Sequence, residues 1–313
     1  MTGVAFAEFL CGIVLTAFFA RRLTEGLAGI TVRLGISERA AAAVFAGFAP
    51  GHLAVGLAAA LAGESGIALG VVTGGAMAAL TLLGGGAALA GAARFERASR
   101  WSGAFLAPAV LLGGGLGVNG VVSRRDGLFL LAAFVLVVLL RMILLRRNAL
   151  APVYLFSRMR HDSVGDRLVW ALLGASLLAL AIGAGLVLAG SRVLMSRFGI
   201  SGMVWGMAVL PLLLVLDQLV KLAPLAPGDN RGRVWPEMLS APPAAFLFNA
   251  GVITLAAPVL VGPEELMFYL PLCLCAAVAV SLFVWSRAMP RWAGGLLLLL
   301  YAVFFGGGFA GWL

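Results

Sequence analysis

The stretch Val32-Arg33-Leu34-Gly35-Ile36-Ser37 returns later in the chain, in altered form, as Ser196-Arg197-Phe198-Gly199-Ile200-Ser201. Each copy lies between two long apolar runs, the first and second runs of its half of the chain. The similarity is short, but its two positions are equivalent. The repeat therefore indicates that two related halves make up the protein.

The composition indicates that lipid, and not water, surrounds most of the protein surface. Of the 313 residues, 62% are hydrophobic and only 11% are charged, which is too few to cover a soluble domain of this size. The chain also contains 42 glycines. Small residues allow helix backbones to approach closely in a bilayer. The sequence therefore predicts an integral membrane protein.

Ten apolar runs approach the length of about 20 residues that a membrane-spanning helix needs. The first five lie near 2–20, 40–62, 66–92, 102–122 and 127–145, and the last five near 168–190, 200–221, 241–261, 264–285 and 292–312. A polar stretch separates the two sets. We expect an all-α fold of ten transmembrane helices, with a first repeat at 1–148, a linker at 149–166 and a second repeat at 167–313.

The basic residues are distributed unevenly between the two sets of predicted loops. Seventeen arginines and lysines lie in the loops of one side and four in those of the other. By the positive-inside rule, the arginine-rich side, which includes the central loop, is cytoplasmic, and both termini are extracytoplasmic. Five helices per half is an odd number, so the halves insert with opposite orientation. Inverted repeats of this kind are typical of secondary transporters, which bind substrate near the midplane where the repeats meet.

The same pattern argues against several other functions. The net charge of +9 comes from short loops and forms no basic patch with interleaved aromatic residues, so we expect the lipid bilayer, and no nucleic acid, as partner. Cys11, Cys273 and Cys275 lie in apolar runs without metal or redox spacing. We find no catalytic constellation and expect neither enzymatic activity nor a cofactor.

Three stretches resemble the Ca²⁺/cation antiporter superfamily, the sodium/calcium exchangers. Residues 53–70, Leu-Ala-Val-Gly-Leu-Ala-Ala-Ala-Leu-Ala-Gly-Glu-Ser-Gly-Ile-Ala-Leu-Gly, resemble its first α-repeat, in which G-T-S-x-P-E-L precedes G-N-x-x-G-S-N-x-x-N. Residues 123–127 and 291–301 resemble the starts of its fifth and tenth helices. The resemblance implies the ten-helix inverted-repeat fold of that superfamily.

The resemblance also implies where ions would bind, although most motif residues differ. His52, in Gly47-Phe48-Ala49-Pro50-Gly51-His52-Leu53, falls on the position of the first family glutamate. In the second repeat, Val215-Leu216-Asp217-Gln218-Leu219 falls on the equivalent motif, and Gln218 replaces its glutamate. The candidate ion-binding residues are His52, Thr73, Asp217, Gln218 and Asn249.

These groups suit a small cation other than calcium. A Ca²⁺ ion takes 6–8 oxygen ligands and prefers carboxylates, which this set can hardly supply. We therefore expect Na⁺ or H⁺ rather than Ca²⁺. His52 titrates near physiological pH, and packing of the repeats as in the family would bring it close to Asp217. In the alternative interpretation, His52 only hydrogen-bonds a neighbouring helix and Asp217 pairs with Lys221, four residues on.

We keep three functional hypotheses. The first is a divergent antiporter of a cation or proton working by alternating access. The second is a transport-inactive relative that serves as a membrane scaffold or partner subunit, and the third is a carrier of a small organic molecule. A pocket of organic-ligand size would favour the carrier, whereas a narrow polar site would favour the antiporter.

Two further features bear on the structure. Pro50, Pro211 and the pair Pro242-Pro243 indicate broken helices that could line a pathway. Glu64, Glu264 and Glu265 fall in predicted outer loops, where we expect solvated side chains.

Overall fold

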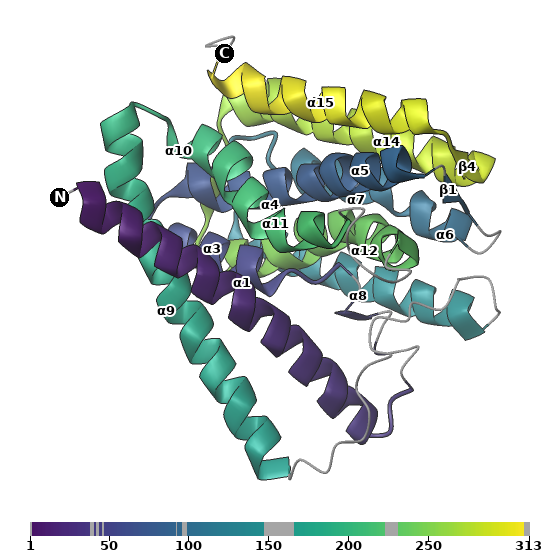
Figure 1. The fold of residues 1–313 in the computed structure, drawn as a ribbon, viewed down its shortest axis with the longest axis horizontal. Helices are drawn as coiled ribbons and strands as arrows, with labels where there is room; N and C mark the ends of the chain where they lie inside the picture. The colour runs from purple at the N-terminus through teal and green to yellow at the C-terminus, as the bar shows by residue number, and fades with distance from the viewer. Residues whose placement is uncertain are drawn as a thin grey trace.

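The computed structural model of the protein describes residues 2–37, 41, 44–45, 47–91, 93–95, 99–146, 166–222 and 231–309. Within these ranges, seven helices are long and apolar enough to cross a membrane, and Pro50–Leu61 and Gly202–Leu216 are shorter apolar helices. The predicted all-α membrane fold is confirmed. Figure 1 shows a bundle of helices from which two crossing helices extend to one side.

The first half supplies a helical segment for each of its five predicted helices. In chain order the elements are α1 (Thr2–Arg33), α3 (Pro50–Leu61), α4 (Ser65–Ala78), the π-helix η1 (Ala79–Leu83), α5 (Gly84–Ala90), β1 (Ala93–Arg94), α6 (Ser99–Ala104), α7 (Leu106–Gly115), β2 (Val121–Val122) and α8 (Arg124–Arg146). The segment α4–η1–α5 is continuous. The largest difference from prediction is α1, which ends at residue 33 and not near 20.

The second half repeats this order. Its elements are α9 (Asp166–Phe198), α10 (Gly202–Val204), the π-helix η2 (Trp205–Val209), α11 (Leu210–Leu222), α12 (Arg231–Pro243), the π-helix η3 (Ala244–Asn249), α13 (Ala250–Ala256), β3 (Val259–Leu260), the π-helix η4 (Glu265–Tyr269), α14 (Leu270–Ser286), β4 (Ala288–Met289) and α15 (Arg291–Phe309). The linker at 149–166 lies almost wholly outside the described residues, so the predicted domain boundaries stay a prediction.

Two small antiparallel strand pairs reveal the relation between the halves. Strand β1 follows the third helical segment of the first half and pairs with β4, which precedes the fifth segment of the second half. Strand β3 follows the third segment of the second half and pairs with β2, which precedes the fifth segment of the first. Exchanging the halves therefore exchanges the two pairs. Because β1 and β2 lie at opposite ends of the fourth segment, the two-fold axis runs across the helices, as inverted repeats require.

The repeated sequence adopts the same backbone conformation in both halves. Gly35 has φ +82° and Gly199 has φ +66°, and each lies in the turn after the first helix of its half. Only glycine enters this left-handed region without a steric penalty. The similarity between residues 32–37 and 196–201 thus marks a turn that both halves share.

Proline shapes the helices in two ways. Pro50 begins α3 after the non-helical residues Phe48 and Ala49, so the predicted interruption is present there. The prediction that Pro242-Pro243 breaks a helix is wrong, because α12 continues without interruption into η3. A proline lacks a backbone N–H, so Pro243 leaves the carbonyl of Leu239 without its helical donor, and the buried guanidinium of Arg141 donates to that carbonyl at 3.5 Å instead.

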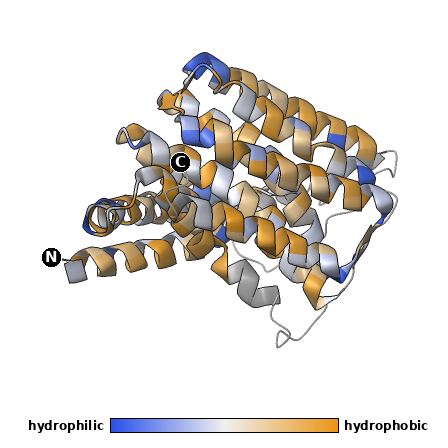
Figure 2. Cartoon of the chain, turned by 90° about the horizontal axis from the view of Figure 1, so that it is seen from above, coloured by the Kyte–Doolittle hydropathy of each residue, from blue (hydrophilic) through white to orange (hydrophobic). Residues whose placement is uncertain are grey.

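Burial identifies the centre of the bundle. Within an 18-residue window of each helix, 83% of the residues are buried in Ser65–Ala90, the third segment of the first half, and 78% in its counterpart Met238–Ala256, but only 17% in Arg124–Leu144. Figure 2 shows predominantly hydrophobic residues along the outer helices, as a lipid-facing surface requires. The two third segments are therefore where polar groups can be shielded from lipid.

Helices α1 and α9 pack along each other through glycines (Figure 1). A Cβ added to Gly190 would lie 2.6 Å from the carbonyl oxygen of Ala5, and one added to Gly12 would lie 2.6 Å from the backbone nitrogen of Val187. The two backbones touch at these positions. Close helix packing is thus the function of these glycines.

Substituting Gly190 by alanine should destabilise the protein, because the added methyl group meets backbone that can move only with α1. Overpacking of this kind costs about 1–3 kcal/mol. Gly185→Ala is the matched control in the same helix, since nothing lies within 4 Å of its added Cβ. We expect thermal unfolding in detergent to give a lower midpoint for Gly190→Ala than for Gly185→Ala. Equal midpoints would contradict the packing described here.

Candidate functional site

A cavity lies in the middle of the bundle, between the second and third helical segments of both halves. The backbone before α3 contributes Gly47, Phe48 and Ala49, and α3 contributes His52. The other lining residues come from α4, η1, α11, α12 and η3: Val71, Gly75, Ala76, Ala79, Leu83, Val215, Ala241, Ala245 and Asn249. We call this space the central cavity. Two of its walls are π-helices, which occur frequently at functional sites.

His52 is held against the neighbouring helix by a glycine. The side chain is buried, and a Cβ on Gly75 would lie 2.7 Å from the ring carbon Cδ2 and 3.1 Å from Nε2. Any larger residue at position 75 would therefore meet the imidazole. The absence of a side chain on Gly75 creates the space that brings His52 to the cavity.

Asn249 supplies a second polar group at the opposite wall. Its side chain is 1% exposed, and its Oδ1 atom accepts no hydrogen bond from the described residues. A buried amide oxygen without a donor costs about 1–3 kcal/mol. A water molecule or a cation in the cavity would satisfy it.

The central cavity has the size of a few water molecules. About 40 Å³ is open to the centres of water-sized spheres. One water needs roughly 10–15 Å³ by this measure. Sites for drug-sized organic ligands measure roughly 300–1,000 Å³. The space therefore suits a small ion or water far better than an organic molecule.

The structure brings together two of the five predicted site residues, His52 and Asn249. Asp217 and Gln218 belong to α11, which reaches the cavity through Val215, but their side chains lie outside what the structure describes. Whether His52 and Asp217 meet stays a prediction. Thr73 faces away from the central cavity.

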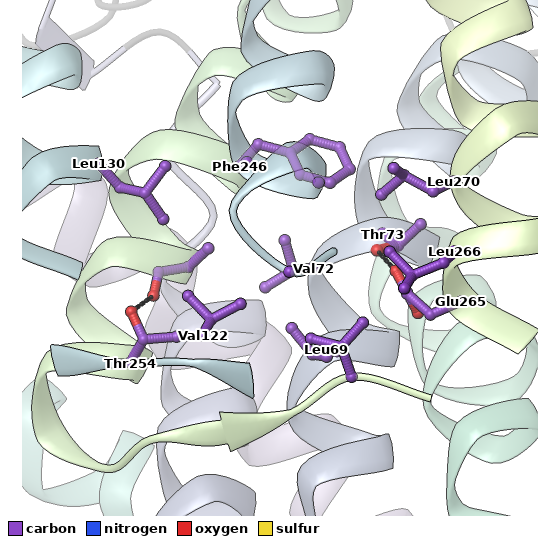
Figure 3. Close-up of a pocket in the computed structure, with 15 residues that line it drawn as sticks. Leu69, Val72, Thr73, Val122, Leu130, Phe246, Thr254, Glu265, Leu266 and Leu270 are labelled. Carbon is purple, nitrogen blue, oxygen red and sulfur yellow. Dashed lines mark hydrogen bonds between the residues drawn. The ribbon is translucent and has the colours of Figure 1, made fainter. Parts of the chain in front are cut away.

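Thr73 borders a second cavity, on the other face of α4 (Figure 3). Its hydroxyl donates to Oε1 of Glu265 at 2.5 Å, across 192 positions of sequence. The remaining lining comes mainly from apolar side chains and from glycines in and just after α7: Leu69, Val72, Gly113, Gly114, Gly117, Val122, Leu130, Phe246, Ala250, Thr254, Val261, Leu266 and Leu270. We call this space the outer cavity. Val122 of β2 and Val261, which follows β3, line one end of it.

Glu265 is the polar residue that the sequence analysis misplaced. We expected a solvated loop side chain, but the residue lies in the first turn of η4 and is 3% exposed. Its neighbour Glu264 remains partly exposed. The predicted helix near 264–285 already allows a helix to begin at the glutamates, so the burial of Glu265, and not its helical state, is what was missed. The contact with Thr73 could not be read from sequence.

The wall between the two cavities is one helix thick. In α4, Val71 lines the central cavity and Val72 the outer one, and in the third segment of the second half Asn249 and Ala250 divide in the same way. Thr73 and Gly75 are two residues apart, which places them about 200° apart around a helix of 3.6 residues per turn. A shift of α4 would therefore change the shape of both cavities.

Comparison with known proteins identifies a family. A sequence model described as sodium/calcium exchanger protein matches residues 4–143 and again residues 168–307, once in each half. No curated protein matches the chain. The double match covers most of the sequence.

Solved structures show the same fold. The sodium-calcium exchanger NCX_Mj, soaked with 100 mM Na⁺ and 10 mM Sr²⁺, is similar with a TM-score of 0.64 and 20% sequence identity, over 97% of this chain and 98% of that chain. The same exchanger soaked with 2.5 mM Na⁺ and 10 mM Sr²⁺ gives 0.63 and 19% over the same shares. At these identities the likeness establishes the architecture and leaves the ion to be argued from the site.

Removing the Thr73 hydroxyl should destabilise the protein, because the buried carboxyl group of Glu265 then loses its donor. We expect Thr73→Val to cost about 1–3 kcal/mol. Thr81→Val is the control: the Thr81 hydroxyl is also buried, but it donates to the carbonyl of Met77 in its own helix. Thermal unfolding in detergent should rank Thr73→Val clearly below Thr81→Val. The reverse order would contradict a structural role for the contact with Glu265.

Proposed function

Because the chain belongs to the sodium/calcium exchanger family, we propose that it is a secondary transporter that exchanges small cations across the membrane by alternating access. The observation that carries this proposal is the central cavity, an ion-sized space between the second and third segments of both halves to which His52 and Asn249 contribute polar groups. Inverted-repeat transporters bind substrate where their repeats meet. The protein is a multi-pass membrane protein, and transport, rather than catalysis, is the function that its family supports.

We propose that the transported ions are H⁺ and a monovalent cation such as Na⁺. The described lining of the central cavity offers an imidazole, an amide oxygen and the non-helical backbone at Phe48 and Ala49. A Ca²⁺ ion would need 6–8 oxygens, preferably from carboxylates. In this proposal Asp217 and Gln218 complete the site from α11, while Thr73 serves the outer cavity.

The orientation in the membrane is also part of the proposal. The seventeen-to-four distribution of basic residues supports a cytoplasmic side that carries the central loop, and extracytoplasmic termini. With this orientation β2 and β3 lie on the extracytoplasmic side. The outer cavity then lies toward the outside of the cell.

One observation favours a second function. His52 occupies the position at which the family motif has a glutamate, so the site has lost a carboxylate. A chain that kept the fold but lost transport would serve as a membrane scaffold or partner subunit. Proteoliposomes distinguish the two functions directly.

The double variant His52→Ala, Asp217→Asn should lose cation-driven proton flux, because it removes both titratable groups proposed for the central site. Flux is measured with a pH dye trapped in proteoliposomes under a Na⁺ gradient. Gly185→Ala, with open space around its added methyl group, should transport as the unmodified protein does. Unchanged flux in the double variant would remove these residues from the mechanism. Flux absent from every protein, the unmodified one included, would support the scaffold.

A further inference from the structure

Glu265 is a buried carboxyl group that the central cavity does not use. Oε1 accepts the hydrogen bond from Thr73, whereas Oε2 is buried and has no hydrogen-bond partner among the described residues. Figure 3 shows the side chain at the edge of the outer cavity, directed toward Thr73. One carboxyl oxygen is thus satisfied and the other is buried without a partner, in a residue that borders a cavity of about 20 Å³, room for roughly one water.

No described basic group compensates the charge of this carboxyl. The titratable groups within electrostatic reach are Glu264 and Tyr269 in the same π-helix and Cys273 in α14, and each is neutral or negative. The described side chains that line the cavity from the other elements carry no charge. Burying an ionised carboxylate in such surroundings has a high free-energy cost, whereas burying the neutral acid has a low one. The surroundings therefore favour uptake of a positive charge at Oε2.

A proton fits this place better than a metal ion does. A metal cation needs several oxygens that converge on one point, but within the described part of the chain Thr73 supplies the one side-chain hydroxyl that bonds the carboxyl. The hydroxyl of Thr254 lies on the far side of the cavity and donates to the carbonyl of Ala250 (Figure 3). A proton needs a single oxygen, and Oε2 is available.

The position of Thr73 connects this carboxyl to the central cavity. Thr73 and Gly75 are in the same turn of α4, and Gly75 is the residue against which His52 packs. Charging or neutralising Glu265 changes how strongly it holds Thr73, because a hydrogen bond to a carboxylate is stronger than one to a neutral acid. The strength of this contact acts on the helix that forms a wall of both cavities.

We propose that Glu265 is a proton-binding residue of the exchanger, in a site that is separate from the central cavity and communicates with it through α4. Uptake transfers a proton from water on the extracytoplasmic side to Oε2 and converts the carboxylate to the neutral acid, and release returns it to water. As a step of exchange, this inference rests on the proposed function. Protonation of Glu265 itself does not require transport.

Infrared difference spectroscopy tests protonation directly. Spectra of the purified protein in lipid, recorded at high and low pH, should contain the C=O stretching band of a buried protonated carboxylic acid. We expect the band to disappear in Glu265→Gln and to remain in Glu264→Gln, the matched control next to it in sequence. A band that is unchanged in Glu265→Gln would overturn the assignment, as would its loss in Glu264→Gln alone.

A second variant covers the case in which Glu265→Gln does not fold. Glu265→Asp keeps a carboxyl group but withdraws it by one methylene, so the band should shift in frequency. Glu264→Asp should leave it in place. A band that stays unchanged in Glu265→Asp would also overturn the assignment.

Proton flux in proteoliposomes then separates this inference from the proposed function. If the unmodified protein transports, Glu265→Gln should lose cation-driven proton flux, and Glu264→Gln should keep it. Full flux in Glu265→Gln would overturn the role in exchange. If the unmodified protein shows no flux, the proposed function fails, while the infrared result still decides whether Glu265 binds a proton.

Discussion

Lipid offers no hydrogen bonds, and this constraint organises the whole molecule. Every polar group at membrane depth must find its partner inside the protein, so polar side chains collect where two segments are shielded by all the others. Those segments are the third of each half, and Thr73, Asn249 and the glycine that accommodates His52 all belong to them. The inverted repeat creates this shielded centre, because the two-fold axis that relates the halves brings their third segments together.

The two cavities divide the chemistry of the centre. The central cavity combines an imidazole and an amide at the meeting point of the repeats, and the outer cavity combines a carboxyl group with a threonine hydroxyl. Among the described lining residues of the two cavities, Glu265 is the one that carries a carboxyl group, fewer than a calcium site prefers. In the proposed exchange, a proton and a cation would bind at two separate sites that share one helix wall and no ligands.

Much of the fold was predictable, because hydropathy and loop charge report directly on lipid. The ten helical segments and the paired halves follow from them. The end of α1 was missed because hydropathy marks only its apolar part, whereas the helix continues through the exposed Arg21–Glu25 pair beyond it. The predicted break at Pro242-Pro243 failed because the carbonyl of Leu239, which loses its helical donor at Pro243, accepts a hydrogen bond from Arg141, a contact between distant segments that local propensity does not reveal.

The site was predictable in part. Motif positions identified His52 and Asn249, which line one cavity. Helix geometry shows why Thr73 does not join them: it is two residues from Gly75, which packs against His52, and residues two apart in a helix point in nearly opposite directions. The burial of Glu265 depends on a partner in the other half of the chain, and no local pattern distinguishes it from the partly exposed Glu264 beside it.

The measurement that tests the central claim most directly is ion selectivity of the unmodified protein in proteoliposomes. A trapped pH dye would follow proton movement under gradients of Na⁺, K⁺ or Ca²⁺, applied one at a time. Exchange of small monovalent cations predicts proton flux with Na⁺ or K⁺ and little with Ca²⁺. Proton flux driven by Ca²⁺ alone, or no flux with any of the three ions, would contradict it.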